Sequence, residues 1–292
     1  MTATIIDGRA VAAAVEEEVH ARVSRLREAG APPPGLEVLL CGDNPASATY
    51  VAGKSRVSER VGIRSAVRTA PGDSSTDELL AVVDSMNADD AVDAILVQLP
   101  LPAQVDTARI LEAVAPEKDV DGFHPMNLGR LAEGRPGIVP CTPAGCMELL
   151  RRYHVPVRGA RAVVVGRSVI VGRPMSMLLL NADATVTVAH SRTPDLAAVC
   201  READLLVVAA GRAGLIDASG VKPGACVVDV GMNRVDGRLR GDVDRPSVEE
   251  VAGWLTPVPG GVGPMTIAML MRNTVDLAEA RRATEASWAP AG

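Results

Sequence analysis

The chain of 292 residues is long enough for about two domains, and 47% of its residues are hydrophobic. It contains no stretch near the ~20 apolar residues that a membrane span needs, so we expect a globular protein outside the membrane. A net charge of −6 gives no overall basic field and argues against nucleic acid as the main partner.

The cysteines and histidines predict no metal or disulfide framework. Five cysteines occur without a CxxC pair, and four scattered histidines without HExxH, so we expect no metal site. The first ten residues include Asp7 and lack the basic start and apolar core of a signal peptide. We therefore expect a cytoplasmic protein in a reducing compartment.

The first 120 residues alternate patterns typical of helices and strands. Apolar residues at helical spacing predict a helix over 9–29, ended by Gly30 and Pro32. The following segments predict strands over 36–40, 63–69 and 92–99, and helices over 48–60 and 76–86 with Ser47 and Thr76 as N-caps. Such alternation predicts a parallel sheet with covering helices.

Tyr50 and Lys54 are the first candidate catalytic residues. They lie four residues apart on the predicted helix 48–60 and so share one helix face. A lysine held in a cleft beside a phenol can lose its charge by desolvation and serve as a base. The alternative is a surface helix with a half-buried tyrosine and a solvated lysine.

Gln98 ends the third predicted strand and precedes Leu99-Pro100-Leu101-Pro102. Ligands of open parallel sheets bind beyond the carboxyl ends of the strands, where Gln98 and Lys54 could meet. The two prolines restrict the backbone of this loop, which could therefore form a rigid surface against a flat ligand. The alternative is an amide that satisfies a loop beside ordinary stiffening residues.

Asp121 is the carboxylate that we single out in the irregular segment 111–131. It precedes Gly122 and the only phenylalanine, and a carboxylate there can accept paired N–H donors from a heterocycle. A turn or cap residue is the alternative. His124 beside Pro125 fits a structural role better than a catalytic one, and Thr142 is predicted to cap a helix over 143–152.

Residues 158–192 predict a dinucleotide-binding unit: strand 162–165, a turn from Gly166 to Gly172, helix 174–181 and strand 185–189. The turn departs from GxGxxG, since Ser168 stands where the second glycine would be. No carboxylate follows the second strand; the turns instead carry three cationic or hydroxyl side chains, Arg167, Ser191 and Arg192. These favour a 2′-phosphate and hence NADP, with solvated loop charges as the alternative.

The remaining segments continue the alternation. They predict a helix over 194–203, strands over 204–210 and 225–231, a turn at Asp236-Gly237, a helix over 265–282 and a loosely attached tail from residue 283. In the loop before the last helix, Pro259-Gly260-Gly261 would let main-chain N–H groups approach a ligand. A stiff interdomain hinge is the alternative.

Taken together, the motifs closely resemble the bifunctional methylenetetrahydrofolate dehydrogenase/cyclohydrolase family. The resemblance spans residues 4 to about 280. It rests on GDNPAS with Tyr50 and Lys54, VQLPLP at 97–102, DVDGFHP at 119–125, CTPAG at 141–145, VVGRSVIVGRP at 164–174, HSRT at 190–193 and TPVPGGVGPMT at 256–266. Cys41 and Ala213 depart from the family, where Val and Pro are usual.

The resemblance implies a role for each candidate. Lys54 would be the catalytic amine, positioned by Tyr50 and Gln98, while Asp121 would hold the pterin. The substrate site would also include Leu99, Pro100, Pro259, Gly260 and Gly261. NADP would be held by Gly166, Arg167, Ser168, Gly172, Ser191, Arg192 and Thr142.

We therefore predict a two-domain α/β enzyme with a cleft between its domains. Residues 1–139 with 265–285 would form the folate-binding catalytic domain, 140–264 a Rossmann-type NADP domain and 286–292 a tail. The enzyme would oxidise 5,10-methylenetetrahydrofolate with NADP+, hydrolyse the methenyl product to 10-formyltetrahydrofolate for purine biosynthesis, and form a homodimer. A short-chain dehydrogenase, a shikimate-dehydrogenase-like enzyme and an inactive NADP-sensing module are the alternatives.

Overall fold

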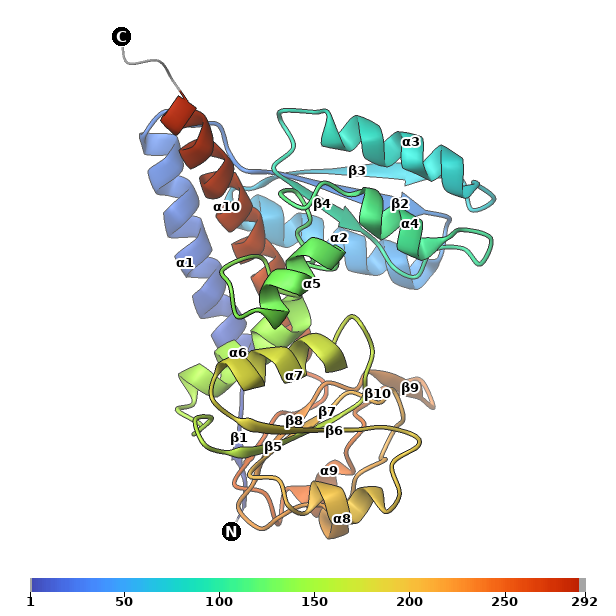
Figure 1. Cartoon of the computed structure of the whole chain (residues 1–292), viewed down its shortest axis with the longest axis vertical. Coiled ribbons are helices and arrows are strands. Elements are labelled where there is room, and N and C mark those ends of the chain that lie inside the picture. The colour runs from blue at the N-terminus through green and yellow to red at the C-terminus, as the bar shows by residue number, and fades with distance from the viewer. Residues whose placement is uncertain (1, 289–292) are drawn as a thin grey trace. The chain divides into compact units, whose positions relative to one another are not determined.

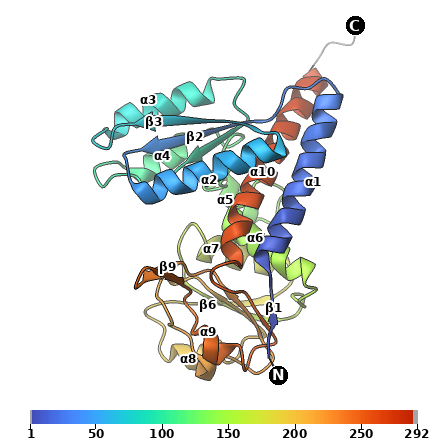
Figure 2. The same cartoon turned by 180° about the vertical axis from the view of Figure 1, so that it is seen from behind.

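The computed structural model describes residues 2–288, and its contacts divide the chain into two compact units. One unit comprises Met1–Ala13 with Arg130–Met269, and the other comprises Ala14–Gly129 with Leu270–Gly292 (Figures 1 and 2). None of the helices within residues 2–288 is both long and apolar enough to cross a membrane.

The first unit is built on a six-stranded parallel sheet in the order β1-β11-β8-β7-β5-β6. Its strands are β1 (Thr4–Ile5), β5 (Arg161–Val165), β6 (Thr185–Ala189), β7 (Leu205–Val208), β8 (Cys226–Asp229) and β11 (Trp254–Leu255). Helices α6 (Cys141–Arg152) and α7 (Gly172–Asn181) lie on one face, and α8 (Leu196–Cys200) and α9 (Arg245–Val248) on the other (Figure 1). The dinucleotide-binding unit predicted over residues 158–192 is thus confirmed here in its order of strand, turn, helix and strand, as β5, α7 and β6.

The second unit has a three-stranded parallel sheet in the order β3-β2-β4. Its elements are β2 (Gly35–Cys41), α2 (Pro45–Val61), β3 (Arg64–Ala70), α3 (Thr76–Asn87), β4 (Ala94–Val97) and α4 (Thr107–Ala113). Buried residues of α3 and α4, Leu79, Val83 and Ile110, form one core with Leu39 and Ile95 of the sheet. Figure 2 shows α2 across the opposite face.

Three helices cross the division between the units: α1 (Gly8–Glu28), α5 (Pro125–Ala132) and α10 (Val262–Trp288). The remaining elements are the η1 turn (Ala218–Gly220) and the hairpin β9 (Asn233–Val235) and β10 (Arg238–Arg240). The predicted hairpin turn at Asp236-Gly237 is confirmed, because both residues have positive φ, as a tight two-residue turn requires. Helix α10 extends six residues beyond the predicted end at 282, whereas residues 289–292 of the predicted tail lie outside the described part.

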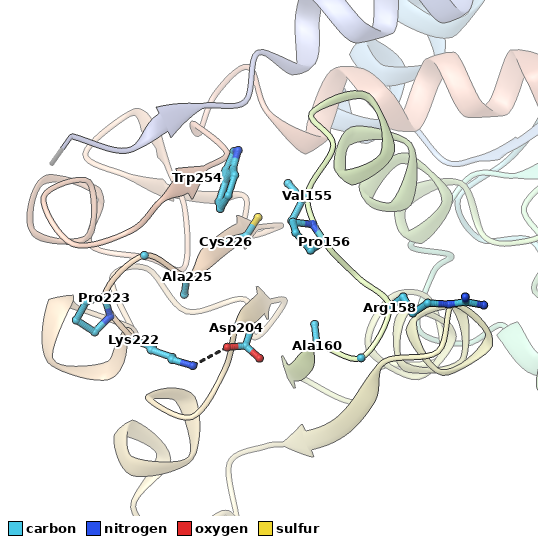
Figure 3. A pocket seen from close by; sticks show the side chains of 12 residues that line it. Val155, Pro156, Arg158, Ala160, Asp204, Lys222, Pro223, Ala225, Cys226 and Trp254 are labelled. Carbon is cyan, nitrogen blue, oxygen red and sulfur yellow. Dashed lines mark hydrogen bonds and ion pairs between the residues drawn. The ribbon is translucent and has the colours of Figure 1, made fainter.

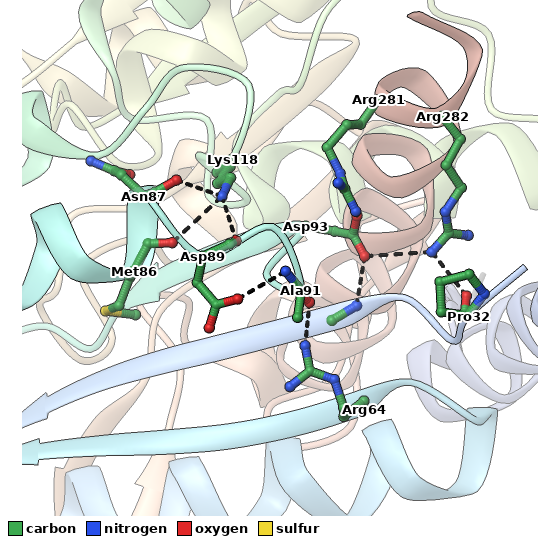
Figure 4. A network of polar contacts seen from close by, with 11 residues as sticks. Pro32, Arg64, Met86, Asn87, Asp89, Ala91, Asp93, Lys118, Arg281 and Arg282 are labelled. Atoms are coloured by element: carbon green, nitrogen blue, oxygen red, sulfur yellow. Dashed lines mark hydrogen bonds and ion pairs between the residues drawn. The ribbon is translucent and has the colours of Figure 1, made fainter. Parts of the chain in front are cut away.

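A buried ionic network joins α10 to the sheet of the second unit (Figure 4). Asp93, 2% exposed and just before β4, accepts from Arg281 Nη2 at 2.6 Å and from the Gly35 backbone N–H at 2.8 Å. Arg282 lies 3.6 Å from the same carboxylate. Since an unpaired buried carboxylate is costly, Arg281 fixes where α10 packs in this unit.

Three predicted helix caps are wrong. The N-cap of α3 is Ser75 rather than Thr76, because Ser75 forms a capping box with Glu78. Helix α2 begins at Pro45, two residues before Ser47, since proline suits a first helical turn. Thr142 lies inside α6, and its hydroxyl bonds Thr266 at 3.1 Å rather than capping the helix.

Candidate functional site

Lys54 and Gln98 meet in the second unit, as the sequence predicted. Lys54 Nζ donates to Gln98 Oε1 at 2.9 Å, and Gln98 Nε2 donates to the Leu99 carbonyl at 2.7 Å. The two residues converge because β2 and β4 are parallel neighbours, so the chain segments that follow them leave the sheet at the same edge. The amide is thereby oriented with its oxygen toward the amine.

Lys54 is one of only three lysines in the chain. Lys118 is buried, donates to the carbonyls of Asn87 and Asp89 at 2.7 and 2.9 Å, and has its pKa lowered by that burial (Figure 4). Lys222 is half exposed and pairs with Asp204 at 2.6 Å. Lys54 is thus the lysine placed at the carboxyl edge of the smaller sheet.

Tyr50 lies one helical turn before Lys54 on α2, and its side chain is 47% exposed. Aromatic residues make up only 2% of the chain, and no other aromatic ring among the described side chains is as exposed. An exposed ring one turn from an oriented amine can pack against a flat ligand.

Asp121 reaches the same edge by a different route. The chain before it runs parallel to β4 through a bridge between Ile95 and Asp119, so Asp121 follows level with the end of that strand. Buried Asp119 anchors this turn by accepting from the His124 N–H at 2.8 Å and from Asn127 Nδ2 at 2.9 Å. Burial raises the pKa of Asp119, and these hydrogen bonds oppose the shift. The anchoring by Asp119 and Asn127 was not predicted.

His124 makes a local contact that suits the structural role predicted from its neighbour Pro125. Its Nδ1 accepts from the Met126 backbone N–H at 3.0 Å at the start of α5.

The turn between β5 and α7 has the close packing of a dinucleotide-binding turn. Gly166 has φ of +123°, and a Cβ there would overlap the Ala209 carbonyl oxygen, while a Cβ at Gly172 would overlap the Gly166 carbonyl. Ser168 Oγ accepts from the N–H groups of Val171 and Gly172 at 3.2 and 3.3 Å. The residues of this turn therefore fit a diphosphate at the N-terminus of α7. Helix α7 is ten residues long, which is long enough to carry a helix dipole.

Arg167, Ser168, Ser191 and Arg192 are all exposed. They follow β5 and β6, which pair in parallel register with Val165 opposite Ala189, so the two turns leave the sheet side by side. Cations and hydroxyls gathered at this edge suit a phosphate group.

The loop before α10 is held by glycine contacts. Gly260 has φ of +105°, and a Cβ at Gly261 would lie 2.6 Å from the Pro257 carbonyl oxygen. A Cβ at Gly8, the first residue of α1, would overlap the Gly261 carbonyl oxygen. Pro259, at the tip of the loop, is exposed. Nothing in the sequence periodicity indicated that Gly8 packs on this loop.

A pocket of about 330 Å³ opens at the amino ends of the strands of the large sheet, opposite the ends where the predicted cofactor turns lie (Figure 3). Trp254, Cys226 and Pro156 line it with the ion pair of Asp204 and Lys222. It lies at the amino ends of β5, β7, β8 and β11, and no predicted site residue lines it.

Comparison with known proteins gives consistent matches along nearly the whole chain. Residues 6–121 match the tetrahydrofolate dehydrogenase/cyclohydrolase catalytic domain, and residues 140–282 match the NAD(P)-binding domain of the same family. The bifunctional protein FolD of Sorangium cellulosum is 58% identical over 96% of this chain and 99% of its own.

Two solved structures are similar in fold and sequence. FolD methylenetetrahydrofolate dehydrogenase/cyclohydrolase from Campylobacter jejuni is 48% identical, with a TM-score of 0.93 over 95% of this chain and 99% of its own. The Trypanosoma brucei dehydrogenase-cyclohydrolase, solved with NADP cofactor and inhibitor, is 41% identical, with a TM-score of 0.92 over 97% and 99%.

Proposed function

Because the chain belongs to the tetrahydrofolate dehydrogenase/cyclohydrolase family, we infer that it catalyses the two reactions for which that family is named. It oxidises 5,10-methylenetetrahydrofolate with NADP+ to 5,10-methenyltetrahydrofolate, and it hydrolyses that cation to 10-formyltetrahydrofolate. The observation that carries this conclusion is 58% identity to a bifunctional relative over nearly the full length of both chains. The matches to both the catalytic and the NAD(P)-binding domain of one family favour this function over a short-chain dehydrogenase and over a shikimate-dehydrogenase-like enzyme.

In the first reaction, NADP+ supplies the hydride acceptor when it is bound. A hydride leaves the methylene carbon of the folate, and no proton leaves that carbon, so the protein contributes mainly orientation. We assign Tyr50 and Asp121 to hold the folate. The exposed ring of Tyr50 supports packing on a flat pterin, and Asp121 can accept paired N–H donors. Leu99, Pro100, Pro259, Gly260 and Gly261 remain our proposal for the rest of the substrate site.

In the second reaction, water adds to the methenyl carbon and loses one proton to a base. One carbon–nitrogen bond then breaks, the remaining hydroxyl becomes the formyl carbonyl, and its proton passes to the leaving ring nitrogen. Lys54 is the proposed base. A neutral amine can donate one hydrogen to Gln98 Oε1 and still present its lone pair to water, which is what the 2.9 Å contact allows. The bond from Gln98 to the Leu99 carbonyl supports this role, because it fixes which end of the amide faces the amine.

For the cofactor, we propose that the 2′-phosphate of NADP binds Arg167, Ser191 and Arg192. Gly166, Ser168 and Gly172 would form the turn under the diphosphate, with Thr142 beside the cofactor. The close glycine contacts and the full-length helix α7 support the diphosphate position.

The wider organisation is also a proposal. We propose that residues 1–139 with 265–285 form the folate domain and 140–264 the NADP domain, although by contacts residues 1–13 group with 130–269. We further propose a cytoplasmic homodimer that binds no nucleic acid and whose product serves purine biosynthesis. The net charge of −6 supports the absence of a nucleic-acid partner, and the resemblance to the family motivates the rest.

The test compares the purified protein with Lys54→Met. The wild type should reduce NADP+ with methylenetetrahydrofolate and hydrolyse methenyltetrahydrofolate without any nucleotide. Lys54→Met should lose about 100- to 10,000-fold of the hydrolysis, because the base is gone, and should keep measurable NADP+ reduction. It should then release the methenyl intermediate, which absorbance detects.

Lys222→Met is the matched control, because it removes a lysine from a half-exposed ion pair. It should leave both activities unchanged. A wild type with neither activity would reject the function, whereas hydrolysis that survives Lys54→Met within tenfold would reject only the role of Lys54.

A further inference from the structure

Two buried carboxylates, Asp229 and Asp242, lie beside the nucleotide-binding edge of the large sheet. Asp229 is the last residue of β8 and Asp242 follows β10, and they are 4% and 0% exposed. Buried carboxylates need strong hydrogen-bond donors, and the partners found here are backbone N–H groups and one amide side chain. No role in the proposed catalysis uses either residue.

Asp242 is held by three successive N–H groups of the loop after β7. Its Oδ2 accepts from Ala210 and Gly211 at 2.6 and 2.8 Å, and its Oδ1 accepts from Arg212 at 2.8 Å. Asn233 Nδ2 also donates to Oδ1 at 2.8 Å. Converging N–H groups of this kind usually form a cradle for an external anion, but here the chain supplies its own carboxylate.

Asp229 accepts hydrogen bonds from the backbone at and next to Asp242. Its Oδ1 accepts from the N–H groups of Gly231 and Asp242, both at 2.9 Å, and its Oδ2 accepts from Val243 at 3.1 Å. Its own N–H donates to Thr256 Oγ1 at 2.7 Å. The pair therefore connects the segments that follow β7, β8 and β11.

Two glycines of the local sequence pack directly against the two carboxyl groups, and a larger residue would not fit at either position. A Cβ at Gly231 would overlap the carboxyl group of Asp242, and a Cβ at Gly241 would overlap that of Asp229. Both glycines let the backbone close directly on a carboxylate.

The segment held by Asp242 forms one wall of the nucleotide crevice. Strands β6 and β7 flank β5 on opposite sides, so the turns after β5 and β7 face each other where a dinucleotide binds in such sheets. The Gly166 turn packs on the carbonyl of Ala209, immediately before Ala210. A shift of the segment 210–212 would therefore change the shape of the crevice.

We propose that Asp229 and Asp242 are positioning residues of the cofactor site, which hold the segment 210–212 in the conformation that NADP requires. This rests on the proposed function, because it assigns the crevice to NADP. Hydrolysis of the methenyl compound needs no nucleotide, so loss of this support affects the two activities differently.

The test is Asp242→Asn in the full chain. In the wild type, each carboxylate oxygen of Asp242 accepts hydrogen bonds from two N–H donors. Whichever way the asparagine amide is turned, its NH2 group replaces one of these oxygens and faces two donors instead of accepting from them. We expect the KM for NADP+ to rise about 10- to 100-fold, as for one or two lost charged hydrogen bonds, with methenyl hydrolysis within about threefold of the wild type.

Asp236→Asn is the matched control, because it makes the same chemical change at the exposed turn of the neighbouring hairpin. Asparagine tolerates the positive φ of that position, so both activities should stay unchanged. If Asp242→Asn does not fold, Asn233→Ala removes a single donor, and the KM for NADP+ should rise a few-fold at unchanged hydrolysis.

Three results distinguish the possibilities. An unchanged KM for NADP+ in both folded variants overturns the proposal. An equal fall of both activities also overturns it, since that describes general damage rather than positioning of the cofactor site. A wild type without either activity instead rejects the proposed function.

Discussion

Replacing Gly8 by alanine tests whether the start of α1 sets the shape of the loop before α10. The added Cβ would overlap the Gly261 carbonyl oxygen, and this neighbour is backbone that cannot rotate away. Atoms in ordinary contact lie ~3.5 Å apart, so the loop or the helix start must move by on the order of 1 Å. The loop has little space to move into, because Gly261 is itself packed closely against Pro257 and Thr256.

A displacement of about 1 Å at a substrate loop can cost ~100-fold in rate. We therefore expect Gly8→Ala to lower kcat/KM with methylenetetrahydrofolate about 100-fold, since the loop is assigned to the substrate. Steady-state assays of both activities measure this. Gly129→Ala is the control, because a Cβ at Gly129 in helix α5 meets nothing within 4 Å. If Gly8→Ala and Gly129→Ala behave alike within threefold, Gly8 does not shape the loop.

Arg167→Ala should weaken NADP binding about 10- to 150-fold and leave NAD binding unchanged, because only NADP has a 2′-phosphate; equal losses in titrations with both nucleotides would refute the assignment. Arg281→Ala should cost about 3 kcal/mol in urea unfolding, because it strips the main partner from buried Asp93, whereas Arg109→Ala in an exposed pair should cost under ~1 kcal/mol. Burial raises the pKa of Asp229 from 3.8 to about 6, so the folded chain keeps its proton to higher pH than the unfolded chain. The stabilisation by this proton is complete below about pH 4 and is lost as pH rises through 6, by about 2–3 kcal/mol relative to Asp229→Asn; a flat difference between the two unfolding curves would contradict it.

Local patterns predicted most of the regular structure. Strand 185–189 was predicted at its observed bounds, and helix 9–29 within one residue. In the helix the apolar spacing reflects burial on one side, because Val11, Val15, Val19 and Val23 are all buried. Strand 92–99 is shorter than predicted, because regular pairing is limited to residues 94–97. The side chains that flank this strand, Asp93 and Gln98, make contacts distant in sequence with Arg281 and Lys54 that no local pattern shows. Strands β1 and β11, of two residues each, were missed because such segments are too short to show any period.

The candidate site was predictable where its chemistry follows a strand end. Lys54 and Gln98 met as expected, because parallel strands deliver their loops to one edge. Asp229 and Asp242 were missed, although one ends a strand and the other follows one, because isolated aspartates in a sequence do not reveal that their partners are backbone N–H groups. The roles of the remaining candidates stay predictions.

The pairing of β1 with β11 has a consequence for synthesis on the ribosome. Thr4 pairs with Trp254, so the first strand of the large sheet leaves the ribosome 250 residues before its partner is made. At roughly 5–20 residues per second, the nascent chain waits on the order of 10 to 50 s with this segment unpaired. The smaller sheet, β2 to β4, needs only residues 35–97 and can form during that interval. Translation pauses late in the message should therefore prolong exposure of the N-terminal segment while leaving the smaller sheet unaffected.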